Sequence, residues 1–226
     1  MEFTPTDIAG MIDHSLLRPD LTRQDIIDGC GIARRYRVAA VCCAPSDVAI
    51  CRQELSGSGV RVAAVVGFPH GYSTTSVKVA EAEQAMADGA DELDMVLHIG
   101  RLRGGELDYV RQDIREVVAA AHARGALVKV ILENCYLTDE QKRAACRLCE
   151  EAGADFVKTS TGFARGGATL EDLALMRASV SARVQIKAAG GVRDLDMALK
   201  VRETGAARFG ATATEAIMEE AYRRGR

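Results

Sequence analysis

The sequence predicts a single-domain α/β fold, a (β/α)8 TIM barrel that covers residues 1–226 and includes an N-terminal helical extension. One observation is a repeated Gly-Ala pair, which separates a helix-like segment from an apolar run at residues 89, 125, 153 and 205. Glycine ends helices because it accepts the left-handed conformation, and a short apolar run suits a strand buried on both faces. A second observation is that eight apolar runs alternate with helical patterns without hairpin signals, which implies a parallel sheet. Eight such units in 226 residues fit a compact barrel, and a doubly wound open sheet is the alternative.

Each predicted strand is an apolar run rich in β-branched residues and bounded by glycine, proline or polar residues. Several runs carry a charged residue at or near their C-terminal end, where an ordinary buried strand avoids charge. The predicted strands are Met11–His14, Val38–Cys43, Val62–Val66, Glu92–Leu97, Val128–Leu132, Phe156–Lys158, Val184–Lys187 and Ala207–Phe209.

The predicted helices follow these strands, and several begin with capping signals. Thr22, Thr138 and Thr169 each stand three residues before an acidic or amide side chain, which is the pattern of a capping box or a close relative. Segment 77–87 is rich in alanine, as expected for a helix that covers a sheet. The predicted helices cover residues 23–36, 46–56, 75–88, 108–124, 139–152, 170–179, 194–204 and 213–223.

Composition and charge exclude several classes of protein. The formal net charge is -3 and no basic cluster is present, so no nucleic-acid partner is expected. No apolar run approaches the length that spans a bilayer, and the N-terminus lacks the basic start and apolar core of a secretory signal. We therefore expect a cytoplasmic protein without a membrane partner.

Cysteine and histidine spacing gives no support for a metal site or disulfides. The seven cysteines are an odd set, and a chain without a secretory signal is expected to keep them reduced. Cys146 and Cys149 form one C-x-x-C, which we interpret as two small residues one helical turn apart rather than a zinc or redox pair, because no second pair completes it. The four histidines lack ligand spacing, so no metal is expected.

Three charged residues stand near the C-terminal ends of predicted strands, where barrels of this kind carry their chemistry. Asp94 fits a general acid or base at the barrel mouth, or equally a structural aspartate paired with a lysine. Lys158 and Lys187 end neighbouring strands at equivalent heights. Two ammonium groups at close range disfavour each other, so one becomes a neutral amine that can form a Schiff base. An ion pair with an acid is the alternative for either lysine alone.

Other residues near the strand ends have weaker signals. Lys129 lies nearer the start of its strand, so we expect a structural role, with the side chain pointing outward or paired with Glu133 or another acid. Glycine-rich turns follow the seventh and eighth strands, and such turns before a helix expose N–H groups to an anion. Together with the two lysines, these turns indicate a phosphorylated substrate.

Nine sequence motifs resemble those of the class I 2-deoxyribose-5-phosphate aldolase family. They occur in the same order as in the family and cover nearly the whole chain. The blocks VKTSTGF and IKAAGG are the most specific. The motifs are MIDHSLL, AAVCCAP, VVGFPHG, ELDMVL, VKVILE, DFVKTSTGF, GATLEDLALM, IKAAGGVRD and ARFGAT.

The resemblance implies a reversible cleavage of 2-deoxy-D-ribose 5-phosphate to acetaldehyde and D-glyceraldehyde 3-phosphate, with no metal and no cofactor. It implies that Lys158 is the Schiff-base lysine, that Lys187 is the second lysine favouring its neutral form, and that Asp94 is the acid/base carboxylate. It further implies substrate-binding positions near the substrate hydroxyls, the mouth or the phosphate. These positions are Asp13, Cys42, Thr159, Gly162, Gly190, Gly191, Gly210 and Thr212.

The chain departs from the family pattern at a few positions. Thr212-Ala213 stands where many relatives carry a serine pair that holds phosphate, so an aldolase for an unphosphorylated acceptor is one alternative function. A non-enzymatic sugar-phosphate-binding barrel is another, although the intact lysines and Asp94 argue against it. Tyr222 lies near the C-terminus, where some relatives carry a proton-transferring tyrosine, but in this chain RRGR follows it. A homodimer is a possible assembly, because dimers are the commonest oligomers among soluble proteins.

Overall fold

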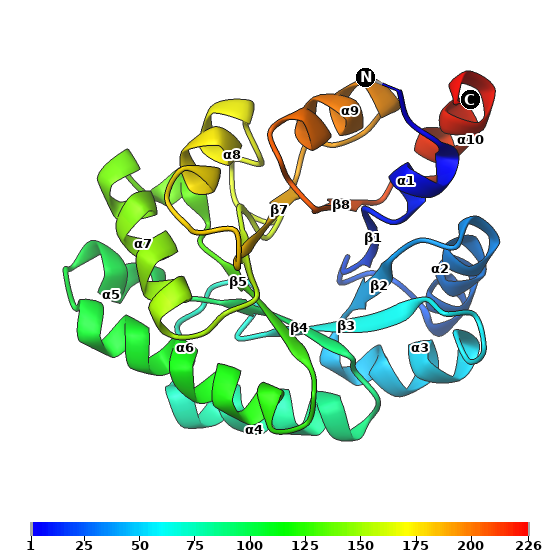
Figure 1. The fold of residues 1–226 in the computed structure, drawn as a ribbon. Coiled ribbons are helices and arrows are strands. Elements are labelled where there is room, and N and C mark those ends of the chain that lie inside the picture. The colour runs from blue at the N-terminus through cyan, green and yellow to red at the C-terminus, as the bar shows by residue number, and fades with distance from the viewer. Residues whose placement is uncertain (1, 226) are drawn as a thin grey trace.

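Eight parallel strands close into a barrel in the order β1 to β8, and the helices form a ring outside it (Figure 1). The computed structural model describes residues 2–225. The predicted (β/α)8 barrel is therefore confirmed, and the open sheet is excluded because β8 pairs with β1. The strands are β1 (Ile12–Leu16), β2 (Ala40–Cys43), β3 (Arg61–Val66), β4 (Glu92–Val96), β5 (Leu127–Ile131), β6 (Phe156–Lys158), β7 (Gln185–Ala189) and β8 (Arg208–Ala211).

The predicted boundaries differ from the observed ones mainly at the glycine-rich ends. β7 runs on to Ala189 and β8 to Ala211, because Ala189 and Gly210 still pair in the barrel register. In β8 the additional residues include Gly210, which lies inside the strand and does not end it. β1 also reaches Leu16, two residues beyond its predicted end at His14.

The helices follow the predicted alternation, with two differences. The expected helix 46–56 is a 3-10 turn followed by a shorter helix, and a short α5 precedes α6 where one helix was predicted. The helices are α1 (Pro5–Ala9), α2 (Arg23–Tyr36), η1 (Pro45–Asp47), α3 (Val48–Glu54), α4 (Thr75–Ala87), α5 (Ile99–Arg103), α6 (Leu107–His122), η2 (Asn134–Tyr136), α7 (Asp139–Glu151), α8 (Leu170–Arg177), α9 (Leu195–Glu203) and α10 (Thr214–Arg224). Within residues 2–225, no helix is long and apolar enough to cross a membrane.

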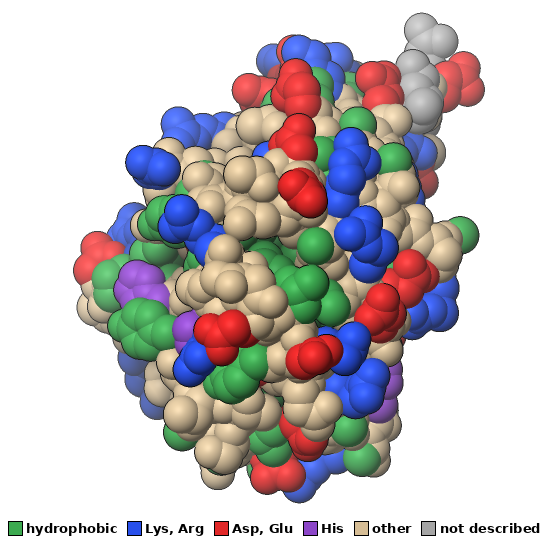
Figure 2. All heavy atoms as spheres, turned by 90° about the vertical axis from the view of Figure 1, so that its left-hand side faces the viewer, with side chains coloured by type: hydrophobic (Ala, Val, Ile, Leu, Met, Phe, Trp, Pro, Cys, Tyr) green, Lys and Arg blue, Asp and Glu red, His purple; other side chains and the backbone are tan. Residues whose placement is uncertain are grey.

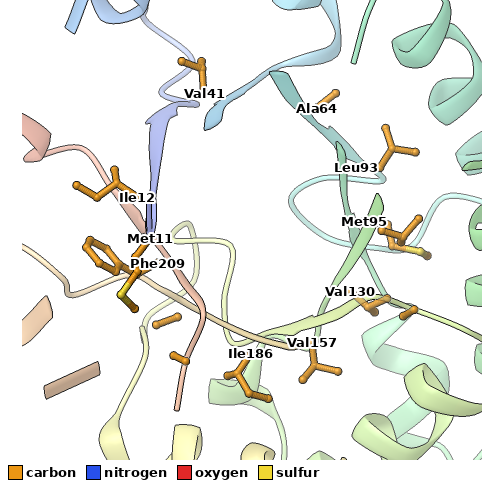
Figure 3. Packing of buried hydrophobic residues seen from close by; sticks show 14 of the residues in the cluster. Met11, Ile12, Val41, Ala64, Leu93, Met95, Val130, Val157, Ile186 and Phe209 are labelled. Carbon is orange, nitrogen blue, oxygen red and sulfur yellow. The ribbon is translucent and has the colours of Figure 1, made fainter. Parts of the chain in front are cut away.

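The apolar core lies between the barrel and its helices. Successive strand residues point to opposite faces of the sheet, and the outward-facing set consists of buried apolar side chains such as Ile12, Leu93, Val130 and Phe209 (Figure 3). The strand residues that alternate with this outward-facing set point into the barrel. Inside the barrel, β2 and β3 contribute a small apolar cluster of Ala40, Cys42, Ala63 and Val65.

The surface has no single-sign character on the face shown in Figure 2, where basic and acidic side chains are interspersed. This arrangement agrees with the small net charge of -3. A continuous basic surface, which nucleic-acid binding requires, is absent from this face.

A wholly buried ion pair joins α4 to α6 outside the barrel. Lys78 Nζ lies 2.6 Å from Asp113 Oδ2 and 3.0 Å from the Val96 carbonyl oxygen, and both side chains have no exposed surface. The Thr75 hydroxyl donates to the other oxygen of Asp113. These bonds fix the two helices against the C-terminal end of β4.

We expect Asp113→Asn to lower the free energy of unfolding by about 3–5 kcal/mol, because it leaves the buried Lys78 ammonium without its counter-charge. Urea unfolding at neutral pH measures this change. Asp88→Asn, at the half-buried C-terminal cap of α4, is the control and should stay within about 0.5 kcal/mol of the wild type. Equal stability of the Asp113 and Asp88 variants would contradict a stabilising role for the buried pair.

Candidate active site

The barrel register brings the predicted catalytic residues together. Lys158 on β6 and Lys187 on β7 are direct partners across the two strands, as predicted from their equivalent heights. Asp94 on β4 is the register partner of Lys129 on β5. All four side chains are buried and lie inside the barrel.

Asp94 is the centre of this group. Its Oδ1 lies 2.7 Å from Lys129 Nζ, while its Oδ2 lies 2.7 Å from both Lys158 Nζ and Lys187 Nζ. Burial would raise the pKa of Asp94, but the three lysines outweigh it and lower the pKa well below its usual range. Asp94 is therefore a carboxylate that three lysine side chains share.

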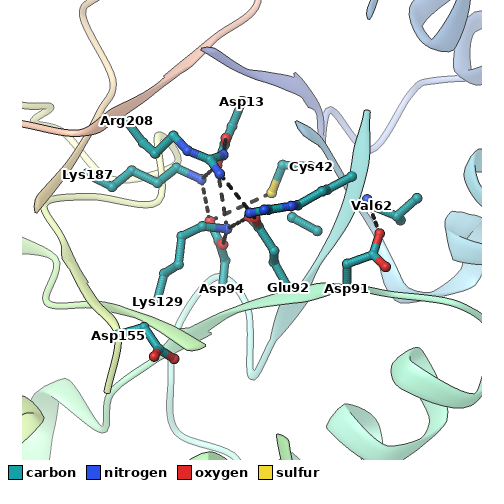
Figure 4. Close-up of polar contacts among 12 residues, drawn as sticks. Asp13, Cys42, Val62, Asp91, Glu92, Asp94, Lys129, Asp155, Lys187 and Arg208 are labelled. Carbon is teal, nitrogen blue, oxygen red and sulfur yellow. Dashed lines mark hydrogen bonds and ion pairs between the residues drawn. The ribbon is translucent and has the colours of Figure 1, made fainter. Parts of the chain in front are cut away.

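Two further carboxylates complete the cluster (Figure 4). Asp13 on β1 pairs with Lys187, and its other oxygen pairs with Arg208 of β8. Glu92 lies deeper, with Oε2 2.6 Å from Lys129 Nζ and Oε1 3.2 Å from Arg208 Nη2. The nearby cations lower the pKa of both carboxyl groups against the effect of burial.

One of the alternatives given for Lys129 is confirmed. Its side chain pairs with acids other than Glu133, namely Glu92 and Asp94, and it points into the barrel and not outward. Burial alone would lower the pKa of Lys129, but the carboxylates around it raise its pKa above the ordinary value. The sequence did not reveal this direction because both faces of β5 are buried, so no polar alternation marks the inner one.

The charges inside the barrel do not balance. Four buried cations, Lys129, Lys158, Lys187 and Arg208, face three buried carboxylates, Asp13, Glu92 and Asp94, and the half-exposed Arg61 also pairs with Glu92. Burial would lower the pKa of Lys187, but Asp13 and Asp94 raise it, so Lys187 is held as an ammonium group. Lys158, in contrast, contacts a single carboxylate, which it shares with two other lysines.

A pocket of about 300 Å³ opens above this cluster at the C-terminal ends of the strands. Lys158 and Lys187 reach it from below, and most of the predicted substrate-binding residues line it. The predicted residues in its lining are Asp13, Cys42, Lys158, Gly162, Lys187, Gly190, Gly191, Gly210 and Thr212. Gly190 and Gly191 have φ angles of 78° and 95°, which favour glycine in the turn that bounds the pocket.

Two predicted residues do not line the pocket. Asp94 lies beneath it, covered by the lysines. Thr159 is buried between β6 and β7, where its hydroxyl donates to the Ala189 carbonyl and accepts from the Ala189 N–H. The side chain of Thr159 therefore joins two strands and does not point toward a substrate.

Cys42 lines the pocket as a protonated thiol. Its Sγ lies 3.8 Å from Asp94 Oδ2. Burial, reinforced by the Asp94 charge, raises the pKa of Cys42 to about 11. A nucleophilic thiolate is thus disfavoured at this position.

The sequence interpretation missed several pocket residues. Arg18 in the β1–α2 loop and Arg193 in the β7–α9 loop add two exposed cations, and Phe163 adds an apolar wall that packs edge-on against Phe68. Arg193 stands two residues after Gly191, so its place in the motif was a usable signal. Arg18 had no comparable signal, because it lies on a loop whose course the barrel decides.

Known proteins similar to this chain show the family to which it belongs. A model of the DeoC/LacD family aldolases matches residues 8–218. The chain belongs to the DeoC/LacD aldolase family. A deoxyribose-phosphate aldolase of Thermococcus gammatolerans is 53% identical over 217 residues, with 95% of this chain and 96% of that protein covered. One of Rhodopirellula baltica is 50% identical, with 95% and 89% covered.

Solved structures place this DeoC/LacD aldolase among proteins of the same fold. The tetrameric deoxyribose phosphate aldolase of Aeropyrum pernix superposes with a TM-score of 0.90 at 29% identity, covering 96% of this chain and 92% of that one. The aldolase QR15 gives a TM-score of 0.92 at 38% identity, with 96% and 97% covered. Within residues 2–225 of this DeoC/LacD aldolase, no three His, Cys, Asp or Glu side chains are grouped as metal ligands.

Proposed function

We propose that this aldolase reversibly cleaves 2-deoxy-D-ribose 5-phosphate to acetaldehyde and D-glyceraldehyde 3-phosphate, with Lys158 as the Schiff-base lysine. The observation that carries the proposal is the position of Lys158 at the pocket floor, beside Lys187 and above a cluster with one more cation than carboxylates. A neutral Lys158 would balance the buried charges of that cluster, in which Lys129, Lys187 and Arg208 face three carboxylates. It is also the barrel lysine with the fewest carboxylate contacts.

The first steps form an iminium ion. The neutral amine of Lys158 attacks the aldehyde carbon C1 of the open-chain sugar, and loss of water from the carbinolamine gives a C=N bond with a positive charge on nitrogen. Lys187, held as an ammonium group by Asp13 and Asp94, supplies a proton to the departing hydroxyl. The iminium nitrogen then serves as the electron sink.

Cleavage follows from the removal of one proton. A water in the pocket passes the proton of the C3 hydroxyl to the Asp94–Lys187 pair, and C3 becomes the aldehyde carbon of glyceraldehyde 3-phosphate. The C2–C3 bond breaks, and its electron pair forms the enamine of a two-carbon unit on Lys158. Protonation of the enamine carbon and hydrolysis release acetaldehyde, and no metal or organic cofactor takes part.

The phosphate is proposed to lie at the β7–β8 side of the pocket. Gly190, Gly191 and Thr212 bound this side, and Arg193 and Arg18 add positive charge near the mouth. Ala213 does not line the pocket, so its missing hydroxyl is not expected to weaken the binding of phosphate there. Charged hydrogen bonds of this kind stabilise by about 1.5–3 kcal/mol each.

We expect kcat/KM for 2-deoxyribose 5-phosphate to exceed that for 2-deoxyribose by about 100-fold or more, because only the former engages these groups. Both kcat/KM values are measured by coupling the release of acetaldehyde to its enzymatic reduction. Arg193→Gln should narrow the preference about 10-fold, whereas Arg115→Gln, exposed on α6, should leave it unchanged. Turnover of neither sugar would contradict the proposed function, and equal turnover of both would favour an unphosphorylated substrate.

Two finer predictions remain part of this proposal. The protein is proposed to act in the cytoplasm, where its seven cysteines stay reduced. It is also proposed to assemble as a homodimer, which light scattering of the purified protein can test.

A further inference from the structure

Glu92 joins the buried cluster to the N-terminal end of the barrel. It is the first residue of β4 and is wholly buried, and its Oε2 lies 2.6 Å from Lys129 Nζ. Its Oε1 accepts from Arg208 Nη2 at 3.2 Å and from Arg61 Nη1 at 3.0 Å. Glu92 is therefore shared by two buried cations and by a third that reaches the surface.

Arg61 contacts Glu92 from the face of the barrel opposite the substrate pocket. It is the first residue of β3, and its side chain is 51% exposed. It lines a cavity of about 260 Å³ at this face together with Arg52 and Asp91. Arg52 and Asp91 form a pair of their own at 3.3 Å, and within residues 2–225 no ion pair joins either of them to Glu92. Arg61 thus connects this outer face with the barrel interior.

A series of ion pairs leads from Arg61 to the amine of the substrate pocket. Beyond Glu92, Lys129 Nζ lies 2.7 Å from Asp94 Oδ1, and Asp94 Oδ2 lies 2.7 Å from Lys158 Nζ. Figure 4 shows Glu92, Lys129 and Asp94 side by side in the middle of this series. All members beyond Arg61 are buried, where water screens charges little. A change of charge at Arg61 is therefore expected to affect Lys158.

We propose that Arg61 is a positioning residue for the reaction, and that it favours the neutral, nucleophilic form of Lys158 by holding Glu92 from the opposite end of the barrel. This inference rests on the Schiff base proposed above. Arg61 neutralises part of the charge of Glu92, so Glu92 holds Lys129 less strongly. Lys129 then draws more on Asp94, and Asp94 stabilises the ammonium form of Lys158 less.

The direct field of Arg61 acts in the same direction. A positive charge disfavours the protonated form of a nearby amine. Loss of Arg61 would remove this charge and leave Glu92 to Lys129, so both effects would favour the ammonium form of Lys158. The reaction would then need a higher pH to reach the same rate.

Other groups also face Lys158, and a substitution of Arg61 leaves them in place. Within residues 2–225, no ion pair joins Arg61 to any of them. A shift caused by the loss of Arg61 is therefore assigned to Glu92 and not to a rearranged pocket. Besides Asp94 and Lys129, these groups are Lys187 of β7, Asp13 of β1, Cys42 of β2 and Glu133 after β5.

The test is the pH profile of kcat/KM for 2-deoxyribose 5-phosphate, whose acid limb reports the proton that Lys158 must lose. We expect R61Q to move this limb to higher pH by about 0.5–1 unit, less than the ~1–3 units that a direct charged neighbour produces. On the limb this equals a loss of about 3–10-fold, while the plateau should stay near the wild-type value. R61K keeps a positive charge beside Glu92 and should restore the wild-type profile.

A second readout excludes titration of the substrate phosphate. The rate at which acetaldehyde and cyanoborohydride label Lys158 should show the same shift in R61Q, because acetaldehyde carries no phosphate. R61M keeps the aliphatic stem of the side chain and gives the same test if R61Q does not fold. A lower plateau with an unmoved limb would indicate a structural role and overturn the inference.

R52Q is the matched control, because Arg52 lines the same cavity but pairs with Asp91. Its pH profile and its labelling rate should equal those of the wild type. Equal shifts in R61Q and R52Q, or a shift that R61K does not reverse, would overturn the role of Arg61 alone. Absence of the adduct on Lys158 of the wild type would overturn the Schiff base as well.

Discussion

Lys158→Met should lower kcat for cleavage by about 10⁵-fold, comparable to the loss of other covalent nucleophiles. Methionine keeps most of the volume of the side chain but cannot form an iminium ion. Because the barrel cluster carries one cation more than its carboxylates, the loss of this amine should not destabilise the fold. A coupled assay of acetaldehyde release measures the change, and urea unfolding tests the fold.

The site of the adduct provides the decisive control. Borohydride reduction with acetaldehyde should add one ethyl group to Lys158 of the wild type, found by mass spectrometry of peptides, and none to the Lys158→Met protein. Lys200→Met, on the exposed side of α9, should react like the wild type. An adduct on Lys187 instead of Lys158 would exchange the roles assigned to the two lysines.

Asp94→Asn should have the second-largest effect, because three lysines depend on this one carboxylate. With all four buried cations charged, the net charge of the buried barrel cluster would rise from +1 to +2. We expect the free energy of unfolding to fall by about 3–5 kcal/mol and kcat of the folded enzyme to fall by about 10³-fold. Urea unfolding at neutral pH and steady-state kinetics of the folded protein measure the two effects.

The Asp113→Asn variant serves to separate the loss of stability from the loss of kcat in Asp94→Asn. It also breaks a wholly buried pair, but outside the barrel, so it should cost similar stability and leave kcat near the wild-type value. Since the folded-state pKa of Asp94 lies below its ordinary value of 3.8, its contribution is complete above that value and is lost as the pH falls through the folded-state pKa. The stability gap between wild type and Asp94→Asn should therefore close in acid. A gap that persists there, or full activity in Asp94→Asn, would contradict the assigned role.

Much of the architecture could be predicted from local patterns. The Gly-Ala pairs and the capping threonines mark helix ends by backbone chemistry that depends on few neighbours. The alternation of eight strands with helices then leads to a barrel. Lys158 and Lys187 were predicted at equal heights on adjacent strands, and the register pairs them directly.

Tertiary contacts decided the direction of each inner side chain. A period of two places alternate residues on one face, but it does not tell which face is inside when both are buried, and this hid the inward turn of Lys129. The same uncertainty applied to Thr159, whose hydroxyl bonds to the backbone of Ala189 instead of facing the pocket.

The sequence by itself determined the repeated βα units and the two lysines at equal heights on adjacent strands, because these depend on local propensity and on strand order, whereas the pairing of β8 with β1 closed the barrel. Only the tertiary structure decided that Asp94 is shared by three lysines, that Arg18 and Arg193 reach one pocket, and that Arg61 pairs with Glu92. These contacts join segments far apart in the chain, and their energies depend on distance and burial, which no local pattern records.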